Sequence, residues 1–427
     1  MSRPRVAPAR QPSLRERNLV LVLREVADGH ELSRARIAAA TGLTRATVST
    51  LVSALVSAGL VRELGPDGGG GVGRPGSFLA LASGPVGIGI EINDDNLATC
   101  TVDLAGTVRR RELVAEDFRT GSPQAALGRA ADALRAAVDD AHAGGGEVVG
   151  VTVAVPGLVE APRGLLRLAP NLGWRDVAVL TELGERAGLT DLPMRLDNEA
   201  NLAALGELWC GGHRRPDGAV LDSYVYVSGE VGIGAATVLE GVLFGGARGF
   251  GGEIGHLSLD RLGLRCECGA RGCLEQYAGQ EAVLRRAGLA EQARTTTGRP
   301  TGPIQELLAL ARAGDPRAVE SIRSAGDSLG LGIAAMVNLV DVDTVVLGGL
   351  YALLAPWLME PVEQQLRGRV LAAGWAPLRV LVARLGADAA VRGAAMSVVR
   401  GLVDDPSGWI ARHAPVEVPR SVVERSG

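Results

Sequence analysis

The sequence predicts an α/β protein in which an N-terminal winged helix-turn-helix precedes a larger, two-lobed body. Helical apolar spacing and helix-capping residues fill residues 14–59, and a glycine-rich stretch at 65–77 separates two short apolar segments. Farther along, two sets of strand-like segments are each followed by helical stretches. That order is typical of two α/β lobes with a cleft between them.

The composition is that of a folded protein with more than one domain. The chain has 427 residues, of which 47% are hydrophobic and 22% are charged. It is therefore too long for one ordinary core and too apolar for a disordered chain. No apolar run reaches the length of a membrane span, and the first residues lack the apolar segment of a signal peptide. We therefore expect a cytoplasmic protein without membrane contact.

The charges divide unevenly between the head and the body. Residues 1–77 carry 11 arginines and 6 acidic residues, whereas residues 78–427 carry 33 arginines and 42 acidic residues. All 44 basic residues are arginine, so any nucleotide site lacks the usual phosphate-binding lysine. A basic head on an acidic body indicates that only the head meets a polyanion.

The head is predicted to contain three helices and a wing. Apolar residues recur at helical spacing over 14–26. Ser33 is expected to cap a short helix that Gly42 ends, and Thr44 to cap a second helix that Gly59 ends. A strand is expected directly after Gly59 and leads into the glycine-rich stretch. Helix, short helix, tight turn, helix and wing together form a winged helix-turn-helix.

This arrangement favours DNA binding, in which the second helix of the pair enters the major groove and the wing reaches phosphate or the minor groove. The candidate DNA contacts are polar or basic residues of these elements: Arg34, Thr44, Arg45, Thr47, Ser49 and Arg74. The alternative is a small helical adaptor domain with solvated arginines. Turn chemistry, the polar helix face and the local charge all favour DNA.

The body is predicted to alternate strands and helices. The expected strands are 84–92, 96–104, 107–115, 147–155, segments within 223–246, and 343–349, and the expected helices are 123–142 and 326–338. Residues 406–427 are expected to form a loose tail.

A compact set of metal-ligating residues lies within the segment 249–279. His256, Cys266, Cys268 and Cys273 supply one imidazole and three thiolates, which is a complete tetrahedral set for zinc with no open position. A closed set predicts a structural and not a catalytic metal. The alternative is three unrelated buried cysteines, which this close spacing disfavours.

Two carboxylates flank the metal-ligating set in the sequence. Glu253 precedes His256 by three residues, and Glu275 follows Cys273 by two. Two carboxylates and an imidazole N–H would suit a polyol, because sugar hydroxyls both donate and accept hydrogen bonds. The alternative is that these residues only support the zinc ligands.

A second polar constellation lies at a predicted strand-to-helix junction. Asn198 and Glu199 stand at this junction, and Asn201 lies within the first helical turn. Either these residues are simple helix caps, or Asn198 and Glu199 reach the same sugar.

These residues together resemble the ROK family of sugar kinases and sugar-responsive repressors, which have an actin-like two-lobed fold. The resemblance covers about residues 14–405, and the attached winged helix-turn-helix is similar to the repressor branch that includes xylose repressors. It implies a winged helix-turn-helix at 1–80, a small lobe at 84–196 with 384–405, a large lobe at 197–383, and the tail at 406–427. It also implies structural zinc on His256, Cys266, Cys268 and Cys273, and sugar contacts at Asn171, Asn198, Glu199, Glu253, His256 and Glu275.

The two phosphate loops of the family kinases are altered in this sequence. The first, which in the kinases reads Asp-x-Gly-Gly-Thr, matches Glu91–Asp95 and has lost both glycines. The second, normally Gly-Thr-Gly-x-Gly, matches Glu230–Gly234 and begins with a carboxylate. Acidic groups at these positions disfavour a phosphate. The position of the catalytic base is Glu199, and a longer carboxylate alone would not abolish catalysis.

We therefore expect a sugar-responsive repressor and not an enzyme. A homodimer, which the family resemblance implies, would read a palindromic operator with two recognition helices about 34 Å apart. The first alternative is an active sugar kinase with a fused DNA-binding head. The second is a scaffold whose acidic body docks a partner protein such as a transporter subunit.

Overall fold

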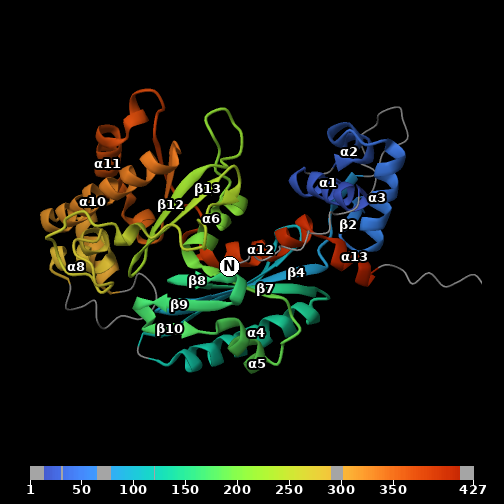
Figure 1. Cartoon of the computed structure of the whole chain (residues 1–427), viewed down its shortest axis with the longest axis horizontal. Coiled ribbons are helices and arrows are strands. Elements are labelled where there is room, and N and C mark those ends of the chain that lie inside the picture. The colour runs from blue at the N-terminus through green and yellow to red at the C-terminus, as the bar shows by residue number, and fades with distance from the viewer. Residues whose placement is uncertain (1–13, 30–31, 65–77, 120, 290–301, 414–427) are drawn as a thin grey trace, which may run out of the picture.

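The computed structural model describes residues 14–29, 32–64, 78–119, 121–289 and 302–413, and it contains a helical head and two lobes, each built on a five-stranded sheet (Figure 1). The head lies beside the first lobe and away from the second, with α12 (Ala389–Asp404) running between the lobes and the head. Among these residues no single helix is long and apolar enough to span a bilayer. Two helices bent against each other, Arg34–Thr41 and Arg45–Ser57, reach the necessary length and composition only when taken together.

The head has the predicted helices. They are α1 (Leu14–Asp28), α2 (Arg34–Thr41) and α3 (Arg45–Ser57), with a small sheet of β1 (Leu32–Ser33), β3 (Phe78–Leu81) and β2 (Val61–Leu64) in that order. The Ser33 side chain accepts the Arg36 N–H at the start of α2, and Thr44 accepts the Thr47 N–H at the start of α3, which confirms both predicted caps. The tip of the wing, with Arg74, lies outside the described residues.

The first lobe is a mixed sheet with helices on both faces. Its strands are β4 (Pro85–Ile92), β5 (Asn96–Asp103), β6 (Val108–Ala115), β7 (Glu147–Val155) and β11 (Met194–Asn198), in the order β11-β7-β4-β5-β6. Helices α4 (Pro123–Ala143) and α5 (Val179–Ala187) bury one face in an apolar core. On the other face α12 approaches β4 so closely that a side chain at Gly89 would overlap the Val391 carbonyl oxygen. A three-stranded sheet of β8 (Leu158–Glu160), β9 (Leu165–Ala169) and β10 (Trp174–Val177) extends the lobe.

The second lobe has the sheet order β14-β13-β12-β15-β16. Its strands are β12 (Tyr224–Gly229), β13 (Ile233–Leu239), β14 (Val242–Leu243), β15 (Thr344–Gly348) and β16 (Arg379–Val382). Its helices are α7 (Glu275–Ala278), α8 (Gln280–Ala287), α9 (Pro303–Arg312), α10 (Pro316–Val340) and α11 (Gly349–Arg369). The apolar residues of these helices form one core with β12, β13, β15 and β16.

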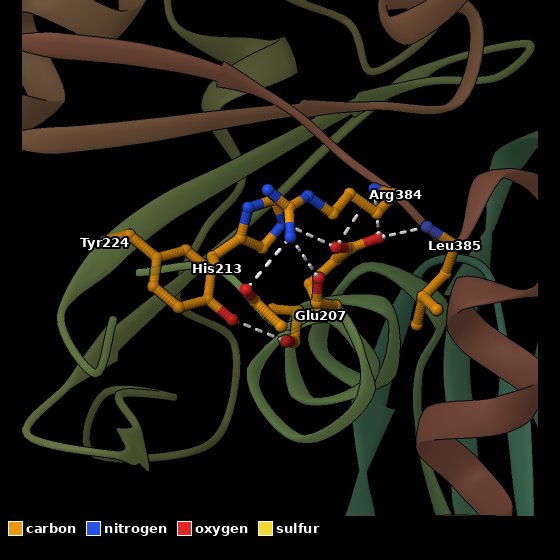
Figure 2. A network of polar contacts seen from close by, with 8 residues as sticks. Glu207, His213, Tyr224, Arg384 and Leu385 are labelled. Atoms are coloured by element: carbon orange, nitrogen blue, oxygen red, sulfur yellow. Dashed lines mark hydrogen bonds and ion pairs between the residues drawn. The ribbon is translucent and has the colours of Figure 1, made fainter. Parts of the chain in front are cut away.

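Two chain crossings connect the lobes and are bonded to each other. Helix α6 (Glu199–Cys210) follows β11 and leads into the second lobe, and the segment after β16 returns to the first lobe through α12. Near the end of α6, the Glu207 carboxylate accepts the backbone N–H groups of Arg384 and Leu385 on the returning segment (Figure 2). The same carboxylate contacts His213, and the Tyr224 hydroxyl donates to a carbonyl of α6.

The prediction of a loose tail over residues 406–427 is wrong for its first part, because Ser407–His413 form helix α13. The Trp409 side chain is buried, and its indole N–H donates to the carbonyl of Ala58 at the end of α3, at 2.8 Å. His413 stacks on Trp409 and contacts Glu147 of β7. Burial of an aromatic ring against the head supplies the apolar contact that orders this segment. Residues 414–427 lie outside the described residues.

Candidate functional site

A cavity of about 270 Å³ lies between the lobes and is lined by residues of both. All six residues predicted to bind a sugar line it: Asn171, Asn198, Glu199, Glu253, His256 and Glu275. Polar groups from separate parts of the chain therefore converge on one concave site, which is the usual form of a small-molecule site.

The junction of β11 and α6 supplies Asn198 and Glu199. The Asn198 side-chain oxygen accepts the N–H groups of Ala200 and Asn201, and its amide donates to the Gly157 carbonyl, so Asn198 is a helix cap that also lines the cavity. Glu199 has a buried carboxylate oxygen with no hydrogen-bond partner. Burial raises the pKa of Glu199 to about 8, and the nearby carboxyl of Glu91 adds to this rise.

Asn171 and Glu275 come from opposite lobes and meet at Gly232. A Cβ at Gly232 would lie 2.7 Å from Oε2 of Glu275 and 3.3 Å from Nδ2 of Asn171, so a larger residue here would displace these side chains. Oε2 of Glu275 also accepts the Ile233 N–H at 3.3 Å. Gly232 therefore lets both side chains approach the same part of the cavity.

The four predicted metal ligands lie together. The ligand atoms of His256, Cys266, Cys268 and Cys273 are all within 4.8 Å of one another. Nδ1 of His256 is 3.8 Å from Sγ of Cys266, and Sγ of Cys268 is 3.7 Å from Sγ of Cys273. Three sulfur atoms and one imidazole nitrogen at this separation can surround a single metal ion.

His256 joins the metal-ligating set to the cavity. Its Nδ1 faces Cys266, and the residue lines the cavity, so Nε2 is the ring nitrogen that remains for a ligand. Glu253 precedes the short helix Ile254–His256 and lines the same wall. Burial raises the pKa of Glu253, although the positive charge of a protonated His256 opposes the rise.

The two segments that the sequence matches to the kinase phosphate loops also line the cavity. Asn93 and Asp94 follow β4, and Glu230 follows β12. A Cβ at Gly349, the first residue of α11, would lie 2.6 Å from Oε1 of Glu230. The Glu230 carboxyl therefore lies at the N-terminus of α11, a position that favours an anion, but burial and the nearby carboxyl of Glu91 raise its pKa well above the ordinary value.

The sequence matched Asn93 and Glu230 to the kinase phosphate loops, but it did not identify Asn93, Asn201 or Glu230 as ligand contacts. Asn93 and Glu230 both directly follow strands of the two sheets, and the ends of strands that meet in a cleft are the signal that would have found them. The Asn201 amide donates a hydrogen bond to the Asp197 carboxylate four residues earlier. The position of Asn201 in the site depends on this side-chain contact, which residue spacing alone does not predict.

The predicted DNA contacts lie on the head, away from the cavity. Thr44, Arg45 and Ser49 are exposed at the start of α3, and the Thr47 hydroxyl is bonded to that of Thr44 at 2.9 Å. Arg34 forms an ion pair with Glu63 of β2 at 2.5 Å. Arg45 on α3, in contrast, has an exposed side chain, which suits a predicted DNA contact.

Comparison with known proteins identifies both parts of the chain. Residues 87–400 match the ROK family, and residues 19–71 match the MarR family. The xylose repressor of Caldicellulosiruptor bescii is 28% identical over 402 residues, covering 92% of this chain and 98% of the repressor. A glucokinase of Streptomyces coelicolor is 30% identical over 322 residues, covering 72% of this chain and 96% of the enzyme.

The fold of the whole chain also matches a solved structure. The crystal structure of a ROK family transcriptional regulator, a homolog of the E. coli MLC protein, aligns with a TM-score of 0.75 and 24% identity over 94% of this chain and 98% of the regulator. This likeness confirms the expected fold of a winged helix-turn-helix followed by an actin-like, two-lobed body. Because the family match covers most of the body and the head is of the MarR type, the chain belongs to the ROK family and carries an N-terminal winged helix-turn-helix.

Proposed function

We propose that this protein is a sugar-responsive transcriptional repressor that binds operator DNA with its head and binds a sugar, without phosphorylating it, between its lobes. The observation that carries the proposal is continuous packing from the cavity to the DNA-binding helix. Glu199 lines the cavity and begins α6, α6 crosses α12, and α12 shares one apolar core with the head. The similarity to proteins named xylose repressors also supports the proposed repressor function.

Two ion pairs and one hydrogen bond reinforce the contact between the head and the body. Arg24 of α1 pairs with Asp404 of α12 at 2.7 Å, and Arg400 of α12 pairs with Asp28 of α1 at 3.1 Å. These exposed pairs contribute orientation more than free energy, whereas the buried Trp409 on α13 fixes the end of α3. A change in the angle between the lobes would therefore move the head with the first lobe.

The cavity suits a polyol. Carboxylates of Glu253 and Glu275 accept hydrogen bonds from hydroxyl groups, while Nδ2 of Asn171 and Nε2 of His256 donate them. Zinc is the metal that the Cys and His set fits best, and when bound it would supply a rigid tetrahedral anchor for His256. A sugar that contacts groups from both lobes would favour the closed arrangement.

The parts of the cavity wall that match the kinase phosphate loops favour a sugar-binding site over a kinase active site. Glu230 places its carboxylate at the N-terminus of α11, where a nucleotide phosphate would otherwise find unpaired backbone N–H groups. Asp94 places a second carboxyl near Glu230 on the same side of the cavity. Burial raises the pKa of Asp94 to about 7 and that of Glu230 well above its ordinary value, and a triphosphate beside them would make ionising either group still less favourable.

As a repressor, the protein would act in the cytoplasm as a homodimer on a palindromic site. Two recognition helices about 34 Å apart would then read successive major grooves. Sedimentation of the protein with and without an operator duplex tests this assembly, with one dimer per duplex as the expected result.

The test of the whole proposal is operator binding in the presence of sugars. The operator is a labelled DNA duplex selected from the promoters next to the gene that encodes this protein. Its binding is measured by fluorescence anisotropy in the presence of each member of a panel of pentoses and hexoses. We expect at least one sugar to change the apparent Kd by about 5-fold to 150-fold, the usual size of allosteric coupling. Glu253→Gln should abolish this response and leave operator binding in the absence of sugar unchanged. A panel without any effect contradicts the sensing function.

A second candidate function, sugar kinase, is favoured by one observation. The chain is 30% identical to a glucokinase, and the half-buried Glu199 lines the cavity with a pKa raised to about 8, which lies near the pH at which a general base works. An ADP-release assay with the same sugar panel separates the two functions. We expect no turnover above the rate without sugar, and sugar-dependent ADP release would establish the kinase instead.

A further inference from the structure

The cavity is lined by six carboxylates and, among its described lining residues, by no arginine. The acidic residues are Asp94, Glu199, Glu230, Glu253, Glu267 and Glu275. Hydroxyl groups can satisfy the carboxylates around His256, but neutral ligand atoms do not balance the charge on the opposite wall. The hydrogen bonds and charges of the acidic residues on that wall therefore help to determine which ligand the cavity binds.

Asp94 on that wall is buried and incompletely bonded. Its side chain lines the cavity, the residue is only 3% exposed, and Oδ2 has no hydrogen-bond partner. Oε2 of Glu199 is likewise buried and unpartnered, and Glu230 opens into the cavity from the second lobe. Two buried oxygen atoms without a partner, one each on Asp94 and Glu199, therefore line the cavity together with the carboxyl of Glu230.

The cation that acts on Asp94 from within the protein is already committed. The Arg119 guanidinium donates two hydrogen bonds to Asp117, both of 2.9 Å, and lowers the pKa of Asp94 only in part. Burial raises the pKa of Asp94 to about 7, which reflects the high free energy of a buried carboxylate without a partner. A ligand that brings a positive charge would relieve this penalty.

We propose that the ligand is a carbohydrate that carries an ammonium group, with its hydroxyls at Glu253, His256 and Glu275 and its ammonium at Asp94, Glu199 and Glu230. This inference rests on the proposed function and narrows the class of sugar. An ammonium group carries three donors and one positive charge, which matches the three acidic groups of that wall. Hydrogen bonds between ions are about twice as strong as those between neutral groups.

A metal ion fits the same wall less well. Among the described residues, the group of metal-ligating atoms that lie within 4.8 Å of one another is the one formed by His256 and the three cysteines. A divalent cation needs a compact coordination sphere of oxygen atoms, whereas the three N–H groups of an ammonium point in different directions. Phosphorylated sugars are disfavoured because they would add negative charge to this wall.

The experiment compares each neutral sugar with its amino counterpart. Isothermal titration calorimetry of the zinc-loaded full-length protein is carried out with glucose, glucosamine, 6-amino-6-deoxyglucose and N-acetylglucosamine, and with the galactose series. At least one amino sugar is expected to bind about tenfold or more tightly than both its neutral parent and its neutral acetylated form.

Variants locate the source of the preference. Asp94→Asn and Glu230→Gln should each reduce the ratio between amino and neutral sugar by about tenfold, with the affinity for the neutral sugar within about threefold of the original. Asp139→Asn is the control, because it removes the same charge from an exposed residue of α4 that does not line the cavity. It should retain most of the preference, and thermal melts of all three variants verify their folding.

The possible failures separate this inference from the proposed function. If neutral sugars bind the protein and weaken operator binding, but no amino sugar binds more tightly than they do, the ammonium inference is wrong and the repressor function stands. If an amino preference survives both Asp94→Asn and Glu230→Gln, the assigned wall is wrong. If no sugar of either kind binds, the inference and the sugar-sensing function fail together.

Discussion

Oε2 of Glu207 lies 2.7 Å from Nε2 of His213 at the point where the first chain crossing between the lobes ends (Figure 2). The Glu207 side chain is fully buried, and that of His213 is 5% exposed. Oε1 of Glu207 also accepts the N–H groups of Arg384 and Leu385, at 3.0 and 2.8 Å. One carboxylate therefore holds together the outgoing and returning crossings.

The first prediction concerns this carboxylate. Burial acts to raise the pKa of Glu207, but the hydrogen bonds from His213, Leu385 and Arg384 outweigh it and hold the pKa below its ordinary value of 4.5. A lowered pKa in the folded state stabilises the protein above about pH 4.5, and the contribution is lost as the pH falls through the folded-state value. Glu207→Gln should therefore destabilise the protein by about 1–3 kcal/mol at pH 7 and flatten the loss of stability in acid.

Urea denaturation at several pH values measures both effects. Glu363→Gln is the control, because Glu363 forms an exposed pair with Arg367 one helical turn away, and its loss should change stability by less than about 0.5 kcal/mol. Equal effects of the two substitutions would show that the Glu207 network does not stabilise the crossings.

The second prediction concerns the metal. The purified protein should contain one zinc per chain, and Cys268→Ser should lose most of it because a thiolate ligand is replaced by a hydroxyl. Cys210→Ser is the control, since Cys210 lies on α6 outside the metal-ligating set and should leave the zinc content unchanged. Elemental analysis gives the result, and a full zinc content in the Cys268→Ser protein would exclude the assigned site.

The third prediction concerns the recognition helix. Arg45 is exposed at the first position of α3, so Arg45→Ala should weaken operator binding by about 1–3 kcal/mol, or roughly 5-fold to 150-fold. Arg17→Ala removes an exposed arginine from α1 of the same head and should change the Kd by less than about threefold. Anisotropy titrations at two salt concentrations separate the loss of a specific contact from a general loss of charge. Similar losses in both variants would argue against α3 as the reading helix.

The head and the metal set could be predicted because their signals are local. Ser33, Thr44 and the turn glycines act on backbone within a few residues, and the cysteines lie within eight positions of one another. Glu199 and Glu275 line the cavity as their positions beside a helix start and the metal ligands predicted, whereas the expectation for Asn171 came from the family resemblance alone.

Contacts between distant segments escaped prediction. Trp409 packs on Ala58 across 351 positions, and the Glu207 network joins segments separated by about 177 positions. No periodicity encodes such a contact, because each partner reads as an ordinary helix or turn residue. The domain boundaries stay a prediction for the same reason, since α6 and α12 belong to both lobes by contact.

The fourth prediction concerns the crossing of α6 and α12. A Cβ at Gly393 of α12 would overlap the Leu202 carbonyl oxygen of α6, so the two backbones meet without room for a side chain. Gly393→Ala should separate the helices and cost about 1–3 kcal/mol. Because these helices connect the lobes to the head, the variant should also lose part of its sugar response.

Gly128→Ala is the matched control for this crossing. Gly128 lies inside α4, and a Cβ there would meet nothing within 4 Å, so alanine should stabilise the protein by about 0.5–1 kcal/mol through its higher helix propensity. The same chemical change thus has opposite expected signs at the two positions, and urea denaturation with operator titrations measures both. If Gly393→Ala proves as stable and as responsive as Gly128→Ala, lobe movement does not depend on close approach of α6 and α12, and the coupling must run through other contacts.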